Sequence, residues 1–160
     1  MPEISKQGTV NHLFGPVAAI VSRGFELVYE RATPLGTGLA EADAPHVPEA
    51  RRFVVAWLAA WGREGLGDVA AHVTSELVTN AFVHGRSGPV RVRGELSATG
   101  VFELRVYSEG LGAVCPGRAR EDAESGRGLW LVEVLADAWD VDPGGLYVWC
   151  RLVAEGRVPW

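Results

Sequence analysis

The sequence predicts an α+β fold, a two-layer sandwich in which helices lie on one face of a mostly antiparallel sheet. Two kinds of pattern lead to this prediction. Apolar residues recur at helical spacing in three segments, while segments that alternate apolar and polar residues occur next to each other in pairs. The strands are therefore grouped and do not alternate strictly with helices, which is typical of α+β domains. At 160 residues the chain has room for one ordinary domain.

The first part of the chain is predicted to hold an arm, one strand and a connection. Residues 1–24 show no clear period, so we expect an N-terminal arm or tail, followed by a single domain at 25–160. Phe25–Arg31 alternates apolar and charged side chains, which indicates a short strand. Residues 33–48 are rich in Pro, Gly, Ala and Asp and should connect this strand to the first helix.

Two helices are predicted to follow. The first begins at Pro48, because proline is favoured in the first turn, and ends near Gly62. The second begins near Gly67–Asp68, with Asp68 as its N-terminal cap, and runs to about His84, with Gly85 as its stop. Apolar residues at four-residue steps give this second helix one buried stripe, formed by Val69, Val73, Leu77 and Ala81.

The second half of the chain is predicted to contain two hairpins, separated by an irregular stretch and a third helix. In chain order these are strands at Pro89–Glu95 and Val101–Tyr107, the irregular stretch 108–125, a helix at Gly128–Asp137, and strands at Trp139–Val141 and Leu146–Val153. An irregular stretch of this length inside a small domain usually has a function, so we interpret it as a candidate lid over a binding site. Tryptophans within the predicted elements are expected to be buried or half-buried: Trp57, Trp61, Trp130, Trp139 and Trp149.

Composition excludes several classes of protein. Hydrophobic residues make up 48% and charged residues 22% of the sequence, as in a globular protein rather than a disordered one. The formal net charge of −5 argues against a general attraction to nucleic acid or anionic membranes. No apolar run has the length of a transmembrane helix, and two cysteines are too few for a disulfide framework. We therefore expect a soluble cytoplasmic domain with neither nucleic acid nor membrane as a direct partner.

The first candidate for chemistry is a polar stripe on the second predicted helix. Glu76, Asn80 and His84 lie four residues apart, which brings a carboxylate, an amide and an imidazole to one helix face. A carboxylate can act as a general base, and the Asn carbonyl oxygen is a hard ligand suited to Mg²⁺. The alternative is the solvated polar edge of an amphipathic helix.

The second candidate is the Gly126-Arg127-Gly128 segment, where the irregular stretch enters the third helix. Glycines let the backbone approach a ligand closely, and the free N–H groups at a helix start bind phosphate. Arg127 could add a guanidinium fork to a phosphate group. The alternative is an ordinary flexible loop with a glycine hinge.

Taken together, these motifs resemble a known family. The sequence contains SELVTNAFVHG at 75–85, ESGRGLWLVEVLADAW at 124–139 and a closing GGLYVWCRL at 144–152. With the hairpin after the first run, they resemble the histidine-kinase-like ATPase fold and, more narrowly, the small actinobacterial relatives of the anti-sigma-factor serine kinases. The resemblance covers residues 46–153. It implies an ATP- and Mg²⁺-dependent kinase that transfers the γ-phosphoryl group to a serine of an antagonist protein and binds a sigma factor, and it leaves homodimer formation open.

The resemblance also implies a role for each matching residue. Asn80 matches the asparagine that binds Mg²⁺ and bridges it to the nucleotide phosphates, and Glu76 matches the catalytic base or water-orienting residue. Gly126 and Gly128 match glycines of a lid that closes over the phosphates, with Arg127 beside them. Three further residues are expected to contact the nucleotide: His84, Gly110 and Leu129.

One position departs from the family pattern. Where the family has an aspartate that accepts a hydrogen bond from the adenine amine, strand register places Ser108, with Glu109 one residue later. Successive strand residues face opposite ways, so Glu109 replaces the aspartate only if a bulge re-aims it. Ser108 can still accept a hydrogen bond, although without the assistance of a charge. The alternative function is therefore a catalytically weak or inactive binding module that keeps the fold and sequesters a transcription regulator.

Overall fold

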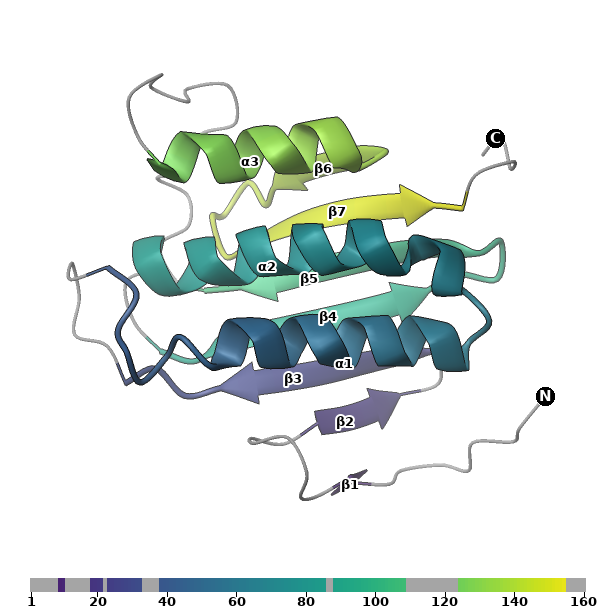
Figure 1. The fold of residues 1–160 in the computed structure, drawn as a ribbon, viewed down its shortest axis with the longest axis horizontal. Helices are drawn as coiled ribbons and strands as arrows, with labels where there is room; N and C mark the ends of the chain where they lie inside the picture. Colours follow the sequence, from purple (N-terminus) through teal and green to yellow (C-terminus); the bar gives the residue numbers. More distant parts are fainter. Residues whose placement is uncertain are drawn as a thin grey trace.

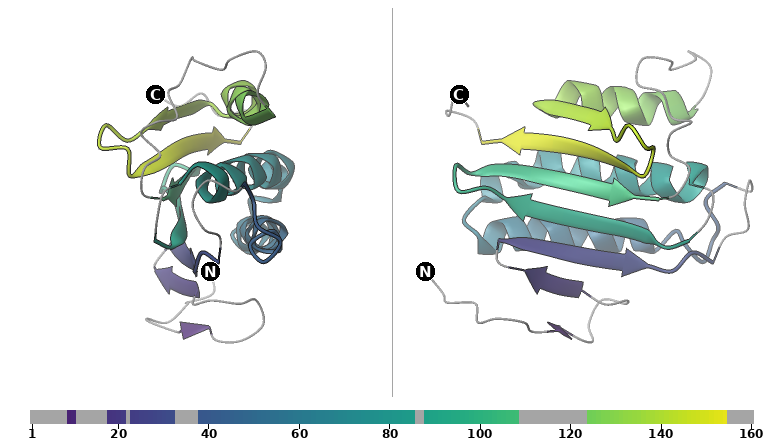
Figure 2. Two further views of the ribbon diagram at one scale, coloured as in Figure 1. Left: turned by 90° about the vertical axis from the view of Figure 1, so that its left-hand side faces the viewer. Right: turned by 180° about the vertical axis from the view of Figure 1, so that it is seen from behind.

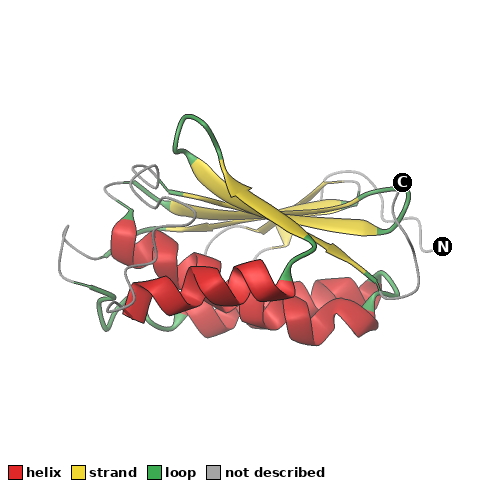
Figure 3. Cartoon of the chain, turned by 90° about the horizontal axis from the view of Figure 1, so that it is seen from above, coloured by secondary structure: helices red, strands yellow, loops and turns green. Residues whose placement is uncertain are grey.

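An antiparallel sheet and a layer of helices make up the fold, with the helices of the described residues on one face of the sheet (Figure 1, Figure 3). The structure is a computed structural model that describes residues 9–10, 18–21, 23–32, 38–85, 88–108 and 124–154. Of residues 9–10, 18–21 and 124–128 it describes the backbone alone. This arrangement is the predicted α+β fold.

The strands of the described residues form one sheet in the order β1-β2-β3-β4-β5-β7-β6, and neighbouring strands are antiparallel. They are β1 (Thr9–Val10), β2 (Ala18–Val21), β3 (Gly24–Tyr29), β4 (Val90–Leu96), β5 (Val101–Tyr107), β6 (Ala138–Val141) and β7 (Tyr147–Val153). Because β3 and β5 both pair antiparallel with β4, they run in the same direction and end at the same edge of the sheet (Figure 1).

Among the residues that the structure describes, helices cover one face of the sheet and leave the other face open (Figure 2). On β5, Phe102, Leu104 and Val106 are buried against the helices, while Glu103 and Arg105 lie on the opposite face. β4 shows the same strict alternation of buried and exposed residues. The alternating pattern in the sequence follows from this one-sided burial.

In the described part of the chain, three α-helices lie side by side on the sheet: α1 (His46–Ala60), α2 (Gly67–His84) and α3 (Glu124–Leu135). A short 3₁₀ turn, η1 (Glu64–Leu66), leads directly into α2. α2 occupies the middle of the layer, since it packs between α1 and α3 and also contacts β4, β5 and β7. No α-helix within the described part of the chain has the length and apolar character needed to span a membrane.

The core between the layers contains an aromatic cluster. Phe25 of β3 lies edge-on to Phe53 and Trp57 of α1, with ring centroids 5.0 and 5.1 Å apart. Trp57 also contacts Phe102 of β5, at 5.9 Å. Gly94 of β4 faces this cluster, and a Cβ there would lie 2.2 Å from Phe25 Cε1. The glycine therefore leaves the space that the Phe25 ring fills.

Most elements lie where the sequence predicts them. The five predicted strands and the first two helices begin and end within two residues of their observed bounds. Within the described parts of residues 1–24, two short strands that the sequence pattern does not predict, β1 and β2, join the edge of the sheet. β2 (AAIV) shows no alternation of apolar and polar residues, and its pairing with β3 is a long-range contact that local pattern does not reveal.

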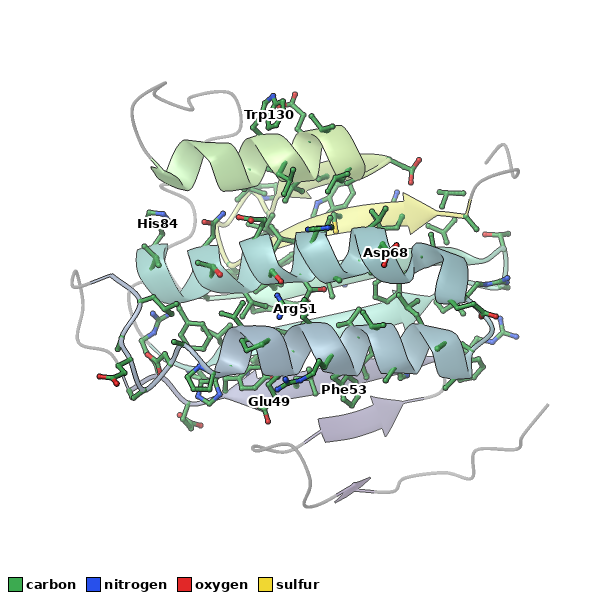
Figure 4. All side chains as sticks on the ribbon, in the orientation of Figure 1. Glu49, Arg51, Phe53, Asp68, His84 and Trp130 are labelled. Atoms are coloured by element: carbon green, nitrogen blue, oxygen red, sulfur yellow. The ribbon has the colours of Figure 1, made fainter. Side chains whose placement is uncertain are left out.

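Three further predictions are wrong in detail. Asp68 does not cap α2, because η1 runs straight into the helix and Leu66 holds the cap position. Asp68 lies in the first turn instead, where its charge complements the positive end of the helix dipole. α3 begins at Glu124 rather than Gly128, since the glycines of its first turns are weak helix formers and obscure the start. Trp130 is 57% exposed, because α3 lies at the edge of the helix layer and this residue faces outward (Figure 4).

Candidate functional site

The ends of two strands, the end of α2 and the start of α3 lie at one edge of the fold (Figure 1, Figure 4). β3 and β5 both finish at this edge, and His84 closes α2 on the same side. α3 packs against α2 and runs in the opposite direction, so its first turn lies where α2 ends. The topology thus gathers segments that are distant in the sequence.

The predicted polar stripe lies on α2. Glu76 and His84 are half-buried, and Asn80 is only 7% exposed. The amide nitrogen of Asn80 is buried and donates a hydrogen bond to no described group. Leaving such a donor unpaired costs about 1–3 kcal/mol, so a ligand or solvent oxygen that accepts a hydrogen bond from this amide would be stabilising.

The side chain of Asn80 also suits a Mg²⁺ ion that is bound jointly by the protein and by phosphate groups. Its carbonyl oxygen is a hard ligand, and Glu76 lies one helical turn away. Among the described residues no three side chains of His, Cys, Asp or Glu lie together so that they could hold a metal ion. Mg²⁺ that is bound with phosphate groups needs only one or two protein oxygens. Asn80 therefore suits a metal whose remaining ligands come from phosphate and water.

Ser108 lies just beyond β5 and contacts the last turn of α2. It is 3% exposed, and its Oγ donates a hydrogen bond to the carbonyl oxygen of Ala81 at 3.1 Å. The same Oγ accepts a hydrogen bond from Nη2 of Arg31 at 2.9 Å. Since Ala81 follows Asn80 in the chain, the structure brings Ser108 to the helical turn that carries the unpaired amide.

Arg31, which the sequence analysis does not single out, closes this end of α2. Its Nη1 donates to the carbonyl of Phe82, and its Nη2 donates to the carbonyl of Ala81 at 2.8 Å. Nε donates to the carbonyl of Gly88 at 3.4 Å. Burial lowers the pKa of Arg31, while the charge of Asp43 raises it. A cation at this place is stabilised by the negative end of the helix dipole.

Gly85 allows the backbone to approach this cluster. It ends α2 in the predicted position. A Cβ here would lie 1.8 Å from Ser108 Oγ and 2.6 Å from Arg31 Nη2, distances that real Cβ contacts do not show. Gly85 is therefore both the stop of the helix and the space into which Ser108 fits.

The glycine-rich segment lies in the helix rather than before it. Gly126 and Arg127 belong to the first four residues of α3, whose N–H groups have no partner within the helix and can bind a ligand. Gly128 is the fifth residue, and Leu129 packs against the core. Four predicted features lie outside the described residues: the Arg127 side chain, Glu109, Gly110 and the remainder of the candidate lid up to residue 123.

Comparison with known proteins adds one finding. The sequence matches the family model of the histidine kinase-like ATPase domain over residues 40–152. The match therefore runs from just before α1 into β7 and includes the polar stripe, Ser108 and the start of α3. A search of curated proteins gave no match.

Proposed function

Because the chain belongs to the family of histidine kinase-like ATPase domains, we propose that it is an ATP- and Mg²⁺-dependent regulatory protein kinase of the anti-sigma-factor type. Family membership supports the general part, an ATP-binding, ATPase- or kinase-like function. The proposal adds a serine of an antagonist protein as the acceptor and a sigma factor as a bound partner. One observation carries it: the buried, unpaired Asn80 amide lies on the same turn of α2 that contacts Ser108.

In this proposal the phosphates bind where α2 ends and α3 begins. Mg²⁺, when bound, neutralises charge that develops on the phosphate groups during transfer. The carbonyl oxygen of Asn80 would hold the metal, and the N–H groups of Gly126 and Arg127 would donate to phosphate oxygens. His84 and Leu129 would border the nucleotide, and Ser108 would accept a hydrogen bond from the adenine amine.

Glu76 would act on the acceptor serine. Its carboxylate would accept a hydrogen bond from the serine hydroxyl, orient the oxygen for in-line attack and take the proton as the bond to the γ-phosphorus forms and the bond from that phosphorus to the bridging oxygen breaks, with ADP as the leaving group. Phosphoryl transfer depends mostly on positioning and on neutralising charge, so this small set of groups is sufficient.

Glu76→Gln tests the kinase assignment. We expect transfer of γ-labelled phosphate from ATP to the serine of a candidate antagonist to fall about 100-fold or more, because the general base is removed. Binding of Mg·ATP should change by less than about twofold, since Gln keeps the shape of the side chain. His72→Gln, at an exposed position of the same helix, serves as the control. Undiminished transfer by Glu76→Gln would contradict the role of Glu76.

A binding module without efficient catalysis is the second candidate, and Ser108 favours it. A neutral hydroxyl accepts a weaker hydrogen bond from an amine than a carboxylate does, so ATP would be held less tightly. Glu76 and Asn80 favour the kinase. The phosphate-transfer assay described above distinguishes the two candidate functions. A wild-type protein that binds a transcription regulator but transfers no phosphate would be a module that sequesters the regulator.

A further inference from the structure

The open face of the sheet carries a hollow next to the start of β4. The hollow has a volume of about 420 Å³ and is open to solvent. Arg91 and Arg93 of β4 border it, together with Tyr107 at the end of β5. Because buried residues alternate with these three along both strands, their side chains lie on the face that the helices of the described residues leave uncovered (Figure 2).

Arg93 forms no ion pair with another residue of the described part of the chain. Its neighbours directly across the sheet are Glu26 of β3 and Arg105 of β5. The carboxylate of Glu26 lies 3.6 Å from Nη1 of Arg91, and Arg105 donates to Glu103 at 2.6 Å. Like charges that face each other across two strands destabilise a sheet. An anion beside Arg93 would therefore be stabilising.

The charges around the hollow favour an anion with a single charge. Two arginines and Glu26 border it, which leaves one positive charge in excess. A carboxylate carries one negative charge, and an arginine binds it through two parallel hydrogen bonds. A phosphate monoester carries nearly two negative charges at neutral pH, so it would bring more negative charge than the hollow can balance.

The rim of the hollow favours a protein segment over a free small molecule. Leu146, which is 56% exposed, and Pro89 add apolar surface beside the arginines. Tyr107 contacts Tyr147 on the same face, with ring centroids 4.8 Å apart. Tyrosine and arginine are enriched where proteins bind each other. Pockets for small molecules enclose most of their ligand, whereas this hollow is open.

We propose that the hollow is a docking site for an acidic segment of a partner protein. In this segment a glutamate or aspartate binds Arg93 and Arg91, and a neighbouring apolar side chain packs on Leu146. Ser108 also borders the hollow, but its hydroxyl is already hydrogen-bonded at the end of α2 and adds no charge. The docking site lies on the opposite face of the sheet from Asn80, and it does not require that the chain binds ATP.

Selection of a random peptide library on the full-length wild type tests this inference. The selected peptides should contain a glutamate or aspartate next to an apolar residue. A synthetic copy of the strongest binder is then titrated calorimetrically into the wild type. A second copy with glutamine in place of the acid should bind about tenfold or more weakly, the factor expected when a hydrogen bond between charged groups is lost. A copy with phosphoserine there should bind no more tightly than the acid.

Variants of the protein show whether the peptide binds in the hollow. Arg93→Met should weaken binding about tenfold or more, and Leu146→Ala about threefold or more. Arg52→Met, at an exposed position of α1, is the control and should bind as the wild type does. Arg93→Met should also keep the wild-type midpoint of urea unfolding, because the fold gives Arg93 no ion pair to lose.

Four results would overturn the inference. The first is a selection that does not enrich acidic peptides, and the second is peptide binding that Arg93→Met leaves unchanged. The third is tighter binding of the phosphoserine copy, and the fourth is a lower unfolding midpoint of Arg93→Met, which would mean that Arg93 serves the fold. A wild-type dimer in sedimentation that Arg93→Met dissociates would also overturn it, since a second copy would then occupy the hollow. None of these results bears on the proposed kinase activity, which is measured separately.

Discussion

Arg31, Gly85 and Ser108 come from three separate segments and together define the end of α2. Arg31 donates a hydrogen bond to the carbonyl oxygen of Ala81 in the last turn of α2, and Ser108, at the end of β5, donates to the same oxygen. Gly85 has no side chain and so leaves room for both groups. Hydrogen bonds to a charged group each contribute about 1.5–3 kcal/mol to stability. The turn that carries Asn80 is therefore held from two strands, which gives the unpaired amide a fixed position.

Gly85→Ala should lower the free energy of unfolding by about 1–3 kcal/mol, because the added Cβ would lie 1.8 Å from Ser108 Oγ and 2.4 Å from the Ala81 carbonyl oxygen. Urea unfolding measures this change. Gly65→Ala is the matched control, since a Cβ there meets nothing within 4 Å, and its effect should stay within about 0.5 kcal/mol. Equal effects of the two substitutions would show that Gly85 is not closely packed.

Among the individual residues, the sequence predicts part of the site. Helical spacing places Glu76, Asn80 and His84 on one face, and the helix that carries them is observed. Arg31 could not be found in this way, because its partners Ala81 and Ser108 lie 50 and 77 residues away. Arg31 reaches the site because it follows β3, and β3 ends at the same edge of the sheet as β5. This shared edge follows from the pairing of both strands with β4, which is known from the structure.

At the scale of elements, burial on one side makes the central strands easy to predict. β5 and β7 alternate strictly, and charged residues cross-link them on the open face. Glu103 of β5 accepts hydrogen bonds from Nε of Arg105 at 2.6 Å and from Nε of Arg151 on β7 at 2.7 Å. Sequence pattern missed β1, β2 and the start of α3, which show no clear period of their own.

Glu103→Gln should remove a pH-dependent part of the stability. Burial alone would raise the pKa of Glu103, but hydrogen bonds and charges from Arg151 and Arg105 outweigh it and lower the pKa below 4.5. The folded protein therefore binds this proton less readily than the unfolded chain. The stabilisation, about 1 kcal/mol or less, is present above pH 4.5 and is lost as the pH falls through the lowered pKa of the folded state.

Urea unfolding between pH 3 and pH 7, a window of about four units around the carboxyl pKa, measures this effect. The difference in stability between wild type and Glu103→Gln should shrink toward the acid end. Glu133→Gln, at an exposed position of α3, is the control and should follow the wild-type profile. A difference that does not change with pH would contradict the assignment of the ion pairs to Glu103.

At the scale of the whole molecule, topology assembles the site. Because β3 and β5 run in the same direction and α3 runs opposite to α2, four segments finish or begin at one edge. The grouping of strands predicts the layers, and the family match covers residues 40–152, but neither specifies how the last turn of α2 is held. That depends on contacts between residues far apart in the sequence, which only the folded chain reveals.

Calorimetric titration of wild type and Asn80→Ala with ATP, with and without Mg²⁺, shows whether the end of α2 binds Mg·ATP. We predict binding by the wild type that strengthens with Mg²⁺, and a loss of about tenfold or more in Asn80→Ala, with His72→Ala unchanged. No binding by the wild type at roughly millimolar ATP, or equally tight Mg²⁺-dependent binding by Asn80→Ala, would rule out an Mg·ATP site at Asn80.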